Sequence, residues 1–213
     1  MSQESVVVLQ KLGISVSRET VSRIERFADL FEKWAGRINL VAPSTKAQLW
    51  DRHIADSAQL YTLIPKSKQI VDLGSGGGFP GIILAILAAD DGTSFVNLVE
   101  SNNKKAGFLR QALLETVGRG AVNAIRIEDA SDRGIKGDII TARALASLDQ
   151  LLVYSEPWFK QDSQCRAFFH KGRDYQAEID KARDRWRFDL VIHPSAVESD
   201  SVILEVSDLS REI

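Results

Sequence analysis

A glycine-rich loop between two apolar runs constrains this chain more than any other feature. The run IVDL (70–73) leads directly into GSGGGFPG (74–81), and a second apolar run, rich in Leu, Ile and Ala, follows at 82–89. This order predicts a strand, a tight turn and a helix. Glycines let the backbone pass close to a ligand because they carry no Cβ, and the helix start points free N–H groups at the loop. We therefore expect a ligand-binding site at residues 69–81.

Two cofactor classes fit the spacing of these glycines. Gly76, Gly78 and Gly81 match the dinucleotide fingerprint G-x-G-x-x-G. The pattern D-x-G-x-G-x-G over residues 72–78 matches the loop of S-adenosylmethionine-dependent methyltransferases, in which Asp72 can meet the amino-acid part of the cofactor. A structural turn without a ligand is a third interpretation. A phosphate-binding P-loop is not expected, because no Gly-Lys-Ser/Thr follows.

Beyond the loop, expected strands and helices alternate along the chain. Strands separated by helices form a mostly parallel sheet. The last two expected strands have little chain between them and predict an antiparallel hairpin, which is typical of class I methyltransferases rather than dehydrogenases. The predicted fold is α/β: a Rossmann-like class I S-adenosylmethionine-dependent methyltransferase with a mostly parallel seven-stranded sheet and helices on both faces. The expected strands are 69–73, 95–99, 122–127, 138–141, 165–170, 188–193 and 201–206, and the expected helices are 82–89, 104–117, 148–159 and 175–185.

The first part of the chain predicts a helical extension. Apolar side chains recur at helical spacing from Val21 to Trp34, and Ser17 is a candidate N-cap. A second helix is expected at 47–63. The expected domains are an N-terminal helical extension, residues 1–64, and a methyltransferase domain, residues 65–213.

The net charge and the cysteine content limit which partners and which cellular compartment we expect. The formal net charge is -2, so a nucleic-acid partner would need a local basic patch. The only cysteine, Cys165, cannot form a disulfide within the chain, and the longest apolar run, 82–89, is too short to span a bilayer. No histidine or cysteine group in the sequence has metal-ligand spacing. We expect a cytoplasmic protein that binds neither a membrane nor a metal.

Ligands of open α/β sheets bind at the carboxyl ends of the strands. Glu100 follows the second expected strand, where its carboxylate can accept hydrogen bonds from two ribose hydroxyls. Ile127 and Glu128 follow the third, in a position beside an adenine, whose amino group needs an acceptor. Arg143 and Lys171 follow the fourth and fifth. Together with the loop, these residues favour S-adenosylmethionine over NAD.

These strand ends offer no evident general base. Cys165 lies within an expected strand, and the fourth strand lacks the Asn/Asp-Pro-Pro-Tyr sequence that accompanies methylation of exocyclic amino groups. A ring nitrogen such as guanine N7 carries a free lone pair and has no proton to lose. Its methylation requires two aligned reactants rather than a base. We therefore expect no catalytic base, and an orienting role for Arg143.

Further motifs are spread over nearly the whole chain. They are KW (33–34), NL (39–40), RHI with DS (52–57), VDLGSG through FPG (71–81), ES with KK (100–105), FLR (108–110), RIE (126–128), RALASL (143–148) and KG (171–172). In these motifs the chain resembles the small-subunit ribosomal RNA methyltransferase G family (RsmG, formerly GidB). The RAxASL run and the FPG ending make the resemblance specific.

The resemblance implies transfer of a methyl group from S-adenosylmethionine to N7 of one guanine in the 530 loop of 16S ribosomal RNA. The partner is then 16S ribosomal RNA or a precursor of the small subunit, and we expect a monomer. Methylation of another RNA or of a small molecule is the alternative. The resemblance also implies cofactor contacts at Gly74, Phe79, Ile127, Glu128 and Arg143, to which the loop and the second strand add Gly76 and Glu100.

Basic residues near the strand ends are candidates for a local electrostatic contact with RNA. They are Lys104, Lys105, Arg126, Lys171 and Arg173. A small-molecule methyltransferase would leave this set, together with Arg110 and Arg143, without a partner. A solvated surface without a partner is the alternative interpretation of these charges. A NAD-dependent oxidoreductase would need a catalytic His or Tyr-x-x-x-Lys group, which the sequence lacks in a recognisable form, and a noncatalytic RNA-binding module would not need an intact cofactor loop.

Overall fold

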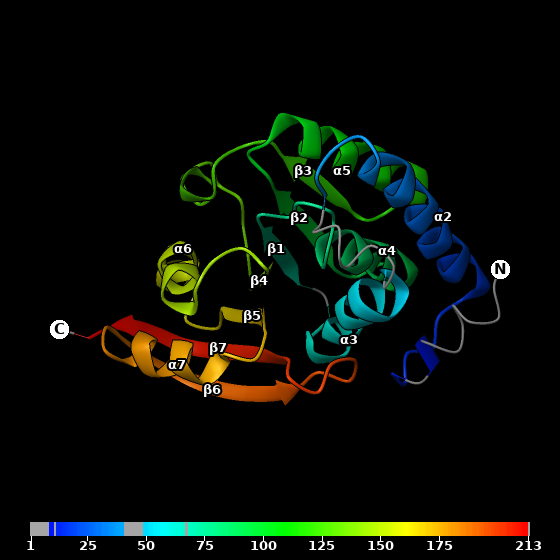
Figure 1. Ribbon diagram of the computed structural model, residues 1–213. Helices are drawn as coiled ribbons and strands as arrows, with labels where there is room; N and C mark the ends of the chain where they lie inside the picture. The colour runs from blue at the N-terminus through cyan, green and yellow to red at the C-terminus, as the bar shows by residue number, and fades with distance from the viewer. Residues whose placement is uncertain (1–8, 11, 41–48, 67, 213) are drawn as a thin grey trace.

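Seven strands form one sheet in the order β3-β2-β1-β4-β5-β7-β6 (Figure 1). A computed structural model describes residues 9–10, 12–40, 49–66 and 68–212. The first five strands run parallel, and β7 pairs antiparallel with both β5 and β6. The mostly parallel sheet and its antiparallel hairpin are therefore confirmed. The strands are β1 (Gln69–Leu73), β2 (Phe95–Val99), β3 (Gly120–Asn123), β4 (Ile139–Arg143), β5 (Arg166–Lys171), β6 (Trp186–Pro194) and β7 (Val202–Arg211).

Helices cover both faces of this sheet, as the sequence predicts. In Figure 1, α2 to α5 lie together on one side, and α6 and α7 lie on the other. Consecutive strand residues point to opposite faces, so Ile70 of β1 packs into the core beneath the first group and Val71 into the core beneath the second. The helices and helical turns are α2 (Arg18–Ala35), η2 (Leu49–Ile54), α3 (Ala55–Leu63), α4 (Gly81–Asp91), α5 (Asn103–Thr116), η3 (Ile127–Asp129), α6 (Leu148–Gln161) and α7 (Tyr175–Arg183).

The third strand differs from the expected range of 122–127. It begins at Gly120 and ends at Asn123, and the chain then enters the 3-10 turn η3. A Cβ on Gly120 would lie 2.4 Å from the Val96 carbonyl oxygen, so a glycine is needed where β3 approaches β2. Glycine normally interrupts strands, but here Gly120 is the first residue of β3.

The N-terminal extension packs directly onto the sheet domain. Helix α2 begins after Ser17, whose hydroxyl oxygen accepts a hydrogen bond from Thr20 N at 3.0 Å, which confirms the expected N-cap. Its buried Phe27 and Phe31 belong to the same hydrophobic cluster as Ile70 of β1. The described part of the extension thus shares one core with the sheet, and the division at residue 64 stays a prediction.

The second expected helix, 47–63, consists of two elements. Residues 47–48 lie outside the described residues. The remainder forms the single π-helical turn η2, followed by α3. Short π-helical turns are frequent at functional sites, and this one faces the carboxyl ends of the strands.

Two further observations concern the reactivity of Cys165 and the possibility of a membrane-spanning helix. Cys165 is buried, and burial raises the pKa of its thiol to about 12, so it is a structural residue rather than a nucleophile. Within the described ranges, no helix is both long enough and apolar enough to cross a membrane.

Candidate functional site

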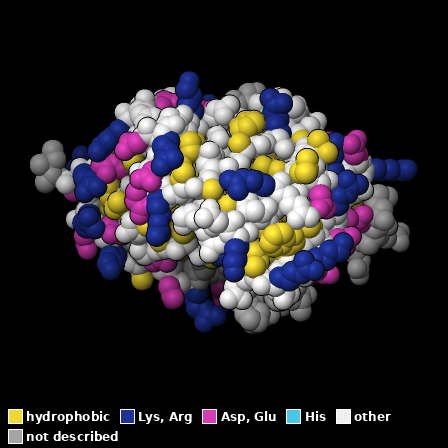
Figure 2. Space-filling model, turned by 90° about the horizontal axis from the view of Figure 1, so that it is seen from above, with side chains coloured by type: hydrophobic (Ala, Val, Ile, Leu, Met, Phe, Trp, Pro, Cys, Tyr) yellow, Lys and Arg dark blue, Asp and Glu magenta, His cyan; other side chains and the backbone are white. Residues whose placement is uncertain are grey.

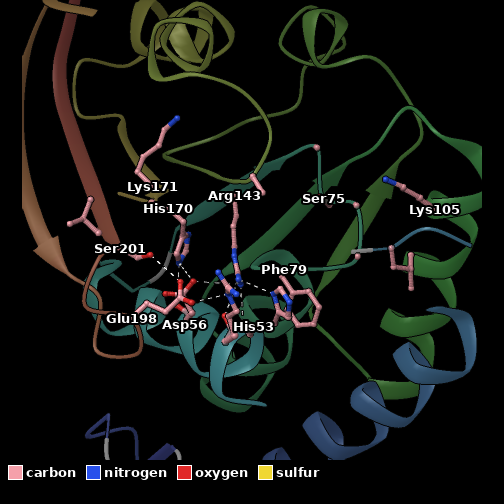
Figure 3. Close-up of a pocket in the computed structure, with 18 residues that line it drawn as sticks. His53, Asp56, Ser75, Phe79, Lys105, Arg143, His170, Lys171, Glu198 and Ser201 are labelled. Atoms are coloured by element: carbon pink, nitrogen blue, oxygen red, sulfur yellow. Dashed lines mark hydrogen bonds and ion pairs between the residues drawn. The ribbon is translucent and has the colours of Figure 1, made fainter. Parts of the chain in front are cut away.

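A cavity of about 510 Å³ opens at the carboxyl ends of β1, β4 and β5 (Figure 3). Phe79 of the glycine loop lines one side. The η2–α3 segment contributes His53 and Asp56, the end of β4 contributes Arg143, and the turn between β6 and β7 contributes Glu198. Four segments far apart in the sequence therefore build one site, at the edge of the sheet where open α/β folds bind ligands.

The glycine loop adopts backbone conformations that favour glycine. Gly74, Gly76 and Gly78 have φ angles of 64°, 51° and 87°, in the left-handed region. The loop leads into α4, which starts at Gly81. Gly74, Gly76 and Phe79 line the cavity, so the structure brings three of the expected cofactor-binding residues together.

Asp72 does not reach the cavity. Its side chain is fully buried beneath the loop and accepts a hydrogen bond from Thr141 Oγ1 at 2.9 Å. Burial raises its pKa to about 6, while hydrogen bonds oppose the rise. A Cβ on Gly81 would lie 2.4 Å from Asp72 Oδ2, so this glycine leaves room for the carboxylate. The expectation that Asp72 meets the cofactor is therefore wrong, and its role is to support the loop from below.

Glu100 braces the loop from β2. Glu100 is 8% exposed, and its carboxylate accepts hydrogen bonds from Gly76 N at 3.0 Å and from Asn102 N at 2.7 Å. A carboxylate has about four lone-pair positions, of which these amides use two. The remaining two are available to ribose hydroxyls, and cofactor contact at Glu100 stays a prediction.

Ile127 and Glu128 lie in η3, beyond β3. Ile127 packs against the core beneath α6, and Glu128 is exposed. Neither residue lines the 510 Å³ cavity, and Glu100 does not line it either. The adenine site that these residues imply therefore lies beside the cavity, at the carboxyl ends of β2 and β3, and remains a prediction.

Arg143 connects the end of β4 to η2. Its Nη2 donates to the Arg52 carbonyl oxygen at 2.9 Å and to His53 Nδ1 at 2.8 Å, and its Nη1 lies 3.5 Å from Asp56 Oδ2 (Figure 3). Burial lowers the pKa of Arg143, and Asp56 opposes that change. The side chain is 14% exposed and faces the cavity. It therefore holds the extension against the sheet, and a contact with cofactor or base stays a prediction.

His53 is fixed by two neighbours. A guanidinium only donates, so His53 Nδ1 accepts from Arg143, and the hydrogen of the neutral ring is on Nε2. The imidazole stacks on the Phe79 ring, with centroids 5.2 Å apart and an interplanar angle of 28°. The Arg143 side chain and the glycine loop are thus coupled through one histidine.

His170 at the end of β5 completes this polar group. Its Nε2 lies 3.2 Å from the Asp56 carbonyl oxygen and 3.6 Å from Asp56 Oδ2. Burial lowers the pKa of His170, although the Asp56 charge opposes the change. The imidazole is therefore neutral near pH 7.

Several cavity residues were not among the expected site residues: His53, Asp56, His170, Glu198 and Ser201. His53 and Asp56 could have been predicted, because they belong to the RHI and DS motifs at 52–57. Nothing in the sequence marks the last two, because they lie in an irregular turn between two strands.

Four of the five expected RNA contacts are accessible. Lys104, Arg126 and Arg173 are exposed, and Lys105 is half-buried and lines the cavity. In Figure 2, which views the molecule from above, lysine and arginine side chains are scattered over the face, and acidic side chains lie among them toward both ends. The basic residues on this face form no continuous patch.

Lys171 is placed differently. It is 7% exposed, and its Nζ donates to the Ala146 carbonyl oxygen at 2.8 Å and to Glu178 Oε2 at 2.6 Å. Figure 3 shows its side chain pointing away from Arg143 and Asp56. Contact between Lys171 and RNA stays a prediction, which its burial and its pairing with Glu178 do not favour. Lys171 holds the 143–148 segment in place.

The residues present fit S-adenosylmethionine. The loop glycines expose backbone to the cavity, Glu100 retains acceptor positions beside the loop, and Arg143 and Lys105 offer positive charge to a carboxylate. Among the described residues, no group of three His, Cys, Asp or Glu side chains has the geometry of a metal site.

Solved structures share this fold. A mutant of MtNAS in complex with S-adenosylmethionine matches 87% of this chain and 74% of its own, with a TM-score of 0.58 and 15% identity. A TehB-like SAM-dependent methyltransferase from Corynebacterium glutamicum matches 83% of this chain and 97% of its own, with a TM-score of 0.52 and 15% identity. These matches show that the chain has the fold of class I S-adenosylmethionine-dependent methyltransferases.

Sequence comparison narrows the class to a family. A family model described as rRNA small subunit methyltransferase G (GidB) matches residues 20–204. The ribosomal RNA small subunit methyltransferase G of Rhizobium etli is 60% identical over 199 residues, covering 93% of this chain and 97% of that protein. The protein of that name from Allorhizobium ampelinum is 56% identical over 208 residues, covering 97% and 99%. The chain belongs to the rRNA small subunit methyltransferase G family, which confirms the resemblance.

Proposed function

We propose that this protein transfers a methyl group from S-adenosylmethionine to N7 of a guanine in the 530 loop of 16S ribosomal RNA. The observation that carries the proposal is the match of residues 20–204 to the rRNA small subunit methyltransferase G family. The choice of guanine N7 and of the 530 loop comes from the family resemblance. The substrate is 16S ribosomal RNA or a precursor of the small subunit, and the enzyme acts in the cytoplasm as a monomer.

The cofactor supplies an electrophilic methyl group when it is bound. On the protein side, Gly74, Gly76 and Phe79 line the cavity and would hold it there. Glu100 would accept hydrogen bonds from the ribose hydroxyls, and Ile127 and Glu128 would flank the adenine. Arg143 braces the amino-acid carboxylate or the guanine O6.

The reaction requires alignment rather than proton transfer. Guanine N7 has a free lone pair, so no side chain has to remove a proton before attack. A misplacement of about 1 Å can cost about 100-fold in rate. The contacts among Arg143, His53, Phe79 and Asp56 link the residues of the cavity wall to one another, which supports this alignment.

The target base must leave the folded RNA to enter the cavity. Lys104, Lys105, Arg126 and Arg173 lie near the strand ends, where they can contact phosphates on either side of it. A small-molecule substrate is the second candidate, but it gives these side chains no partner.

A genetic experiment tests the proposal. Borohydride–aniline treatment cleaves RNA at 7-methylguanine, and primer extension maps the cleavage. Cells that lack this gene should lose one stop in 16S ribosomal RNA, and the wild-type copy should restore it. A folded Arg143→Ala copy should restore it poorly. Persistence of the stop in the deletion strain would contradict the proposal.

A further inference from the structure

Among the described residues that line the cavity, two are carboxylates, and they differ in accessibility. The Asp56 side chain is 13% exposed and lies against Arg143 and His170. The Glu198 side chain is 38% exposed. Glu198 is therefore the cavity carboxylate that a substrate can reach.

The turn that carries Glu198 is fixed onto α3. Gln59 Nε2 donates to the Pro194 carbonyl oxygen at 2.9 Å, and Gln59 Oε1 accepts from Ala196 N at 2.9 Å. Ser195 Oγ accepts from Glu198 N at 3.1 Å. The backbone of Glu198 is thus held in place by hydrogen bonds.

The Glu198 carboxylate is oriented but not saturated. Arg52 Nε lies 2.8 Å from Oε1, and Ser201 Oγ donates to Oε2 at 3.1 Å. These contacts use two of about four lone-pair positions. One lone-pair position on each oxygen is left, which suits a ligand with two adjacent N–H donors.

Figure 3 places Glu198 and Ser201 on the side of the cavity opposite Ser75 and Phe79, with Arg143 between them. Guanine carries acceptors at N7 and O6 on one edge and the donors N1–H and N2–H₂ on the other. When N7 faces the glycine loop, these donors face the opposite wall. Enzymes that bind an extruded base read it through its Watson–Crick edge.

We propose that Glu198 selects guanine by accepting hydrogen bonds from N1–H and from the N2 amino group of the target base. The inference rests on the proposed function. Adenine has no N1–H and no amino group at C2, so a carboxylate in this position accepts guanine and rejects adenine. Glu198 is a specificity-determining residue and takes no part in bond making.

An analogue experiment tests this role. Small subunits are reconstituted with 16S ribosomal RNA that carries guanosine or inosine at the target position, because inosine lacks only the N2 amino group. Single-turnover methyl transfer is measured for the wild-type protein, for Glu198→Ala and for Glu198→Gln. Loss of one hydrogen bond to a charged group should lower the rate of methyl transfer by about tenfold to hundredfold. The wild-type protein should therefore methylate guanosine faster than inosine by that factor. Glu198→Ala should lose the preference.

Glu212→Ala is the matched control. Glu212 is also a half-exposed partner of an arginine, Arg187, at 3.2 Å, but it lies at the other end of the β6–β7 hairpin. This variant should keep the wild-type preference. Calorimetry should also show unchanged affinity of Glu198→Ala for S-adenosylmethionine.

Two outcomes would overturn the inference. One is an equal preference for guanosine in the wild-type and Glu198→Ala proteins. The other is an equal loss of rate by Glu198→Ala on both substrates together with weaker cofactor binding, which would indicate a structural role. The isosteric variant Glu198→Gln separates the effect of charge from the effect of shape. Absence of guanosine methylation by the wild-type protein would instead contradict the proposed function.

Discussion

At the scale of single residues, side chains around the cavity hold one another and the neighbouring backbone in place. Glu100 holds two backbone amides beside the glycine loop, and Arg143 holds backbone oxygens of η2. His53 joins the two groups, since it accepts from Arg143 and stacks on Phe79. A substitution in this network therefore acts on the shape of the site as well as on direct contacts.

Glu100→Ala should weaken S-adenosylmethionine binding by about tenfold or more. Hydrogen bonds to a charged group contribute about 1.5–3 kcal/mol each, and the variant also removes the brace on Gly76. Isothermal calorimetry measures the affinity, with Glu212→Ala as the control. Unchanged affinity in a folded Glu100→Ala protein would rule out the ribose contact.

Strand-end residues were the predictable part of the site. Glu100 and Arg143 could be placed from sequence because parallel strands present their carboxyl ends at one edge. Glu198 could not, because no periodicity governs an irregular turn. The burial of Lys171 could not be predicted either, because charge alone does not reveal Glu178, whose carboxylate lies 2.6 Å from its ammonium group.

At the scale of elements, helix α2 supports the glycine loop from behind. Phe27 lies 5.3 Å from the Phe79 ring and 6.2 Å from the Phe108 ring, between centroids. A Cβ on Gly78 would lie 3.0 Å from Phe27 Cζ. Helix α2 of the N-terminal extension therefore packs against the glycine loop, a contact that its helical periodicity alone did not indicate.

Phe27→Ala should lower the free energy of unfolding by about 3–5 kcal/mol, because it empties a fully buried position. It should also weaken S-adenosylmethionine binding, since Phe79 loses its support. Urea unfolding and calorimetry measure the two effects. Phe188→Ala is the control: Phe188 is buried in the core on the other face, so this variant should lose stability and keep cofactor affinity. Equal cofactor affinity in both variants would contradict the support role.

The order of elements was predictable because hydrophobic runs and turn residues alternate along the chain. The boundaries of β3 could not be predicted. A glycine is needed at position 120 because Val96 O, on the neighbouring strand β2, leaves no room for a side chain. The π-helical turn η2 was also missed. Its backbone oxygens are satisfied by Arg143, about 90 residues further along the chain.

At the scale of the whole molecule, a chain with a net charge of -2 has to bind a polyanion. Scattered basic side chains rather than a continuous patch face solvent in Figure 2. We therefore predict that RNA binding depends on a few lysines and arginines near the cavity, and that these dominate its salt dependence.

Charge reversal of Lys104 and Lys105 should weaken RNA binding and lower its salt slope by about 0.7–0.9 for each phosphate that the variant no longer neutralises. Binding to small subunits at several salt concentrations measures the slope. Lys160→Glu is the control, because Lys160 is exposed on α6 and pairs with Glu156. If the double variant binds like this control, Lys104 and Lys105 are solvated surface residues.

Transfer of labelled methyl by the purified protein tests the central claim most directly. The substrate is small subunits from cells that lack this gene, and the donor is S-adenosylmethionine with a labelled methyl group. Nuclease digestion and mass spectrometry then identify the labelled nucleoside and its position. The account predicts 7-methylguanosine at one position in the 530 loop. Label on guanine N1 or N2, on another base, or on no RNA would contradict it.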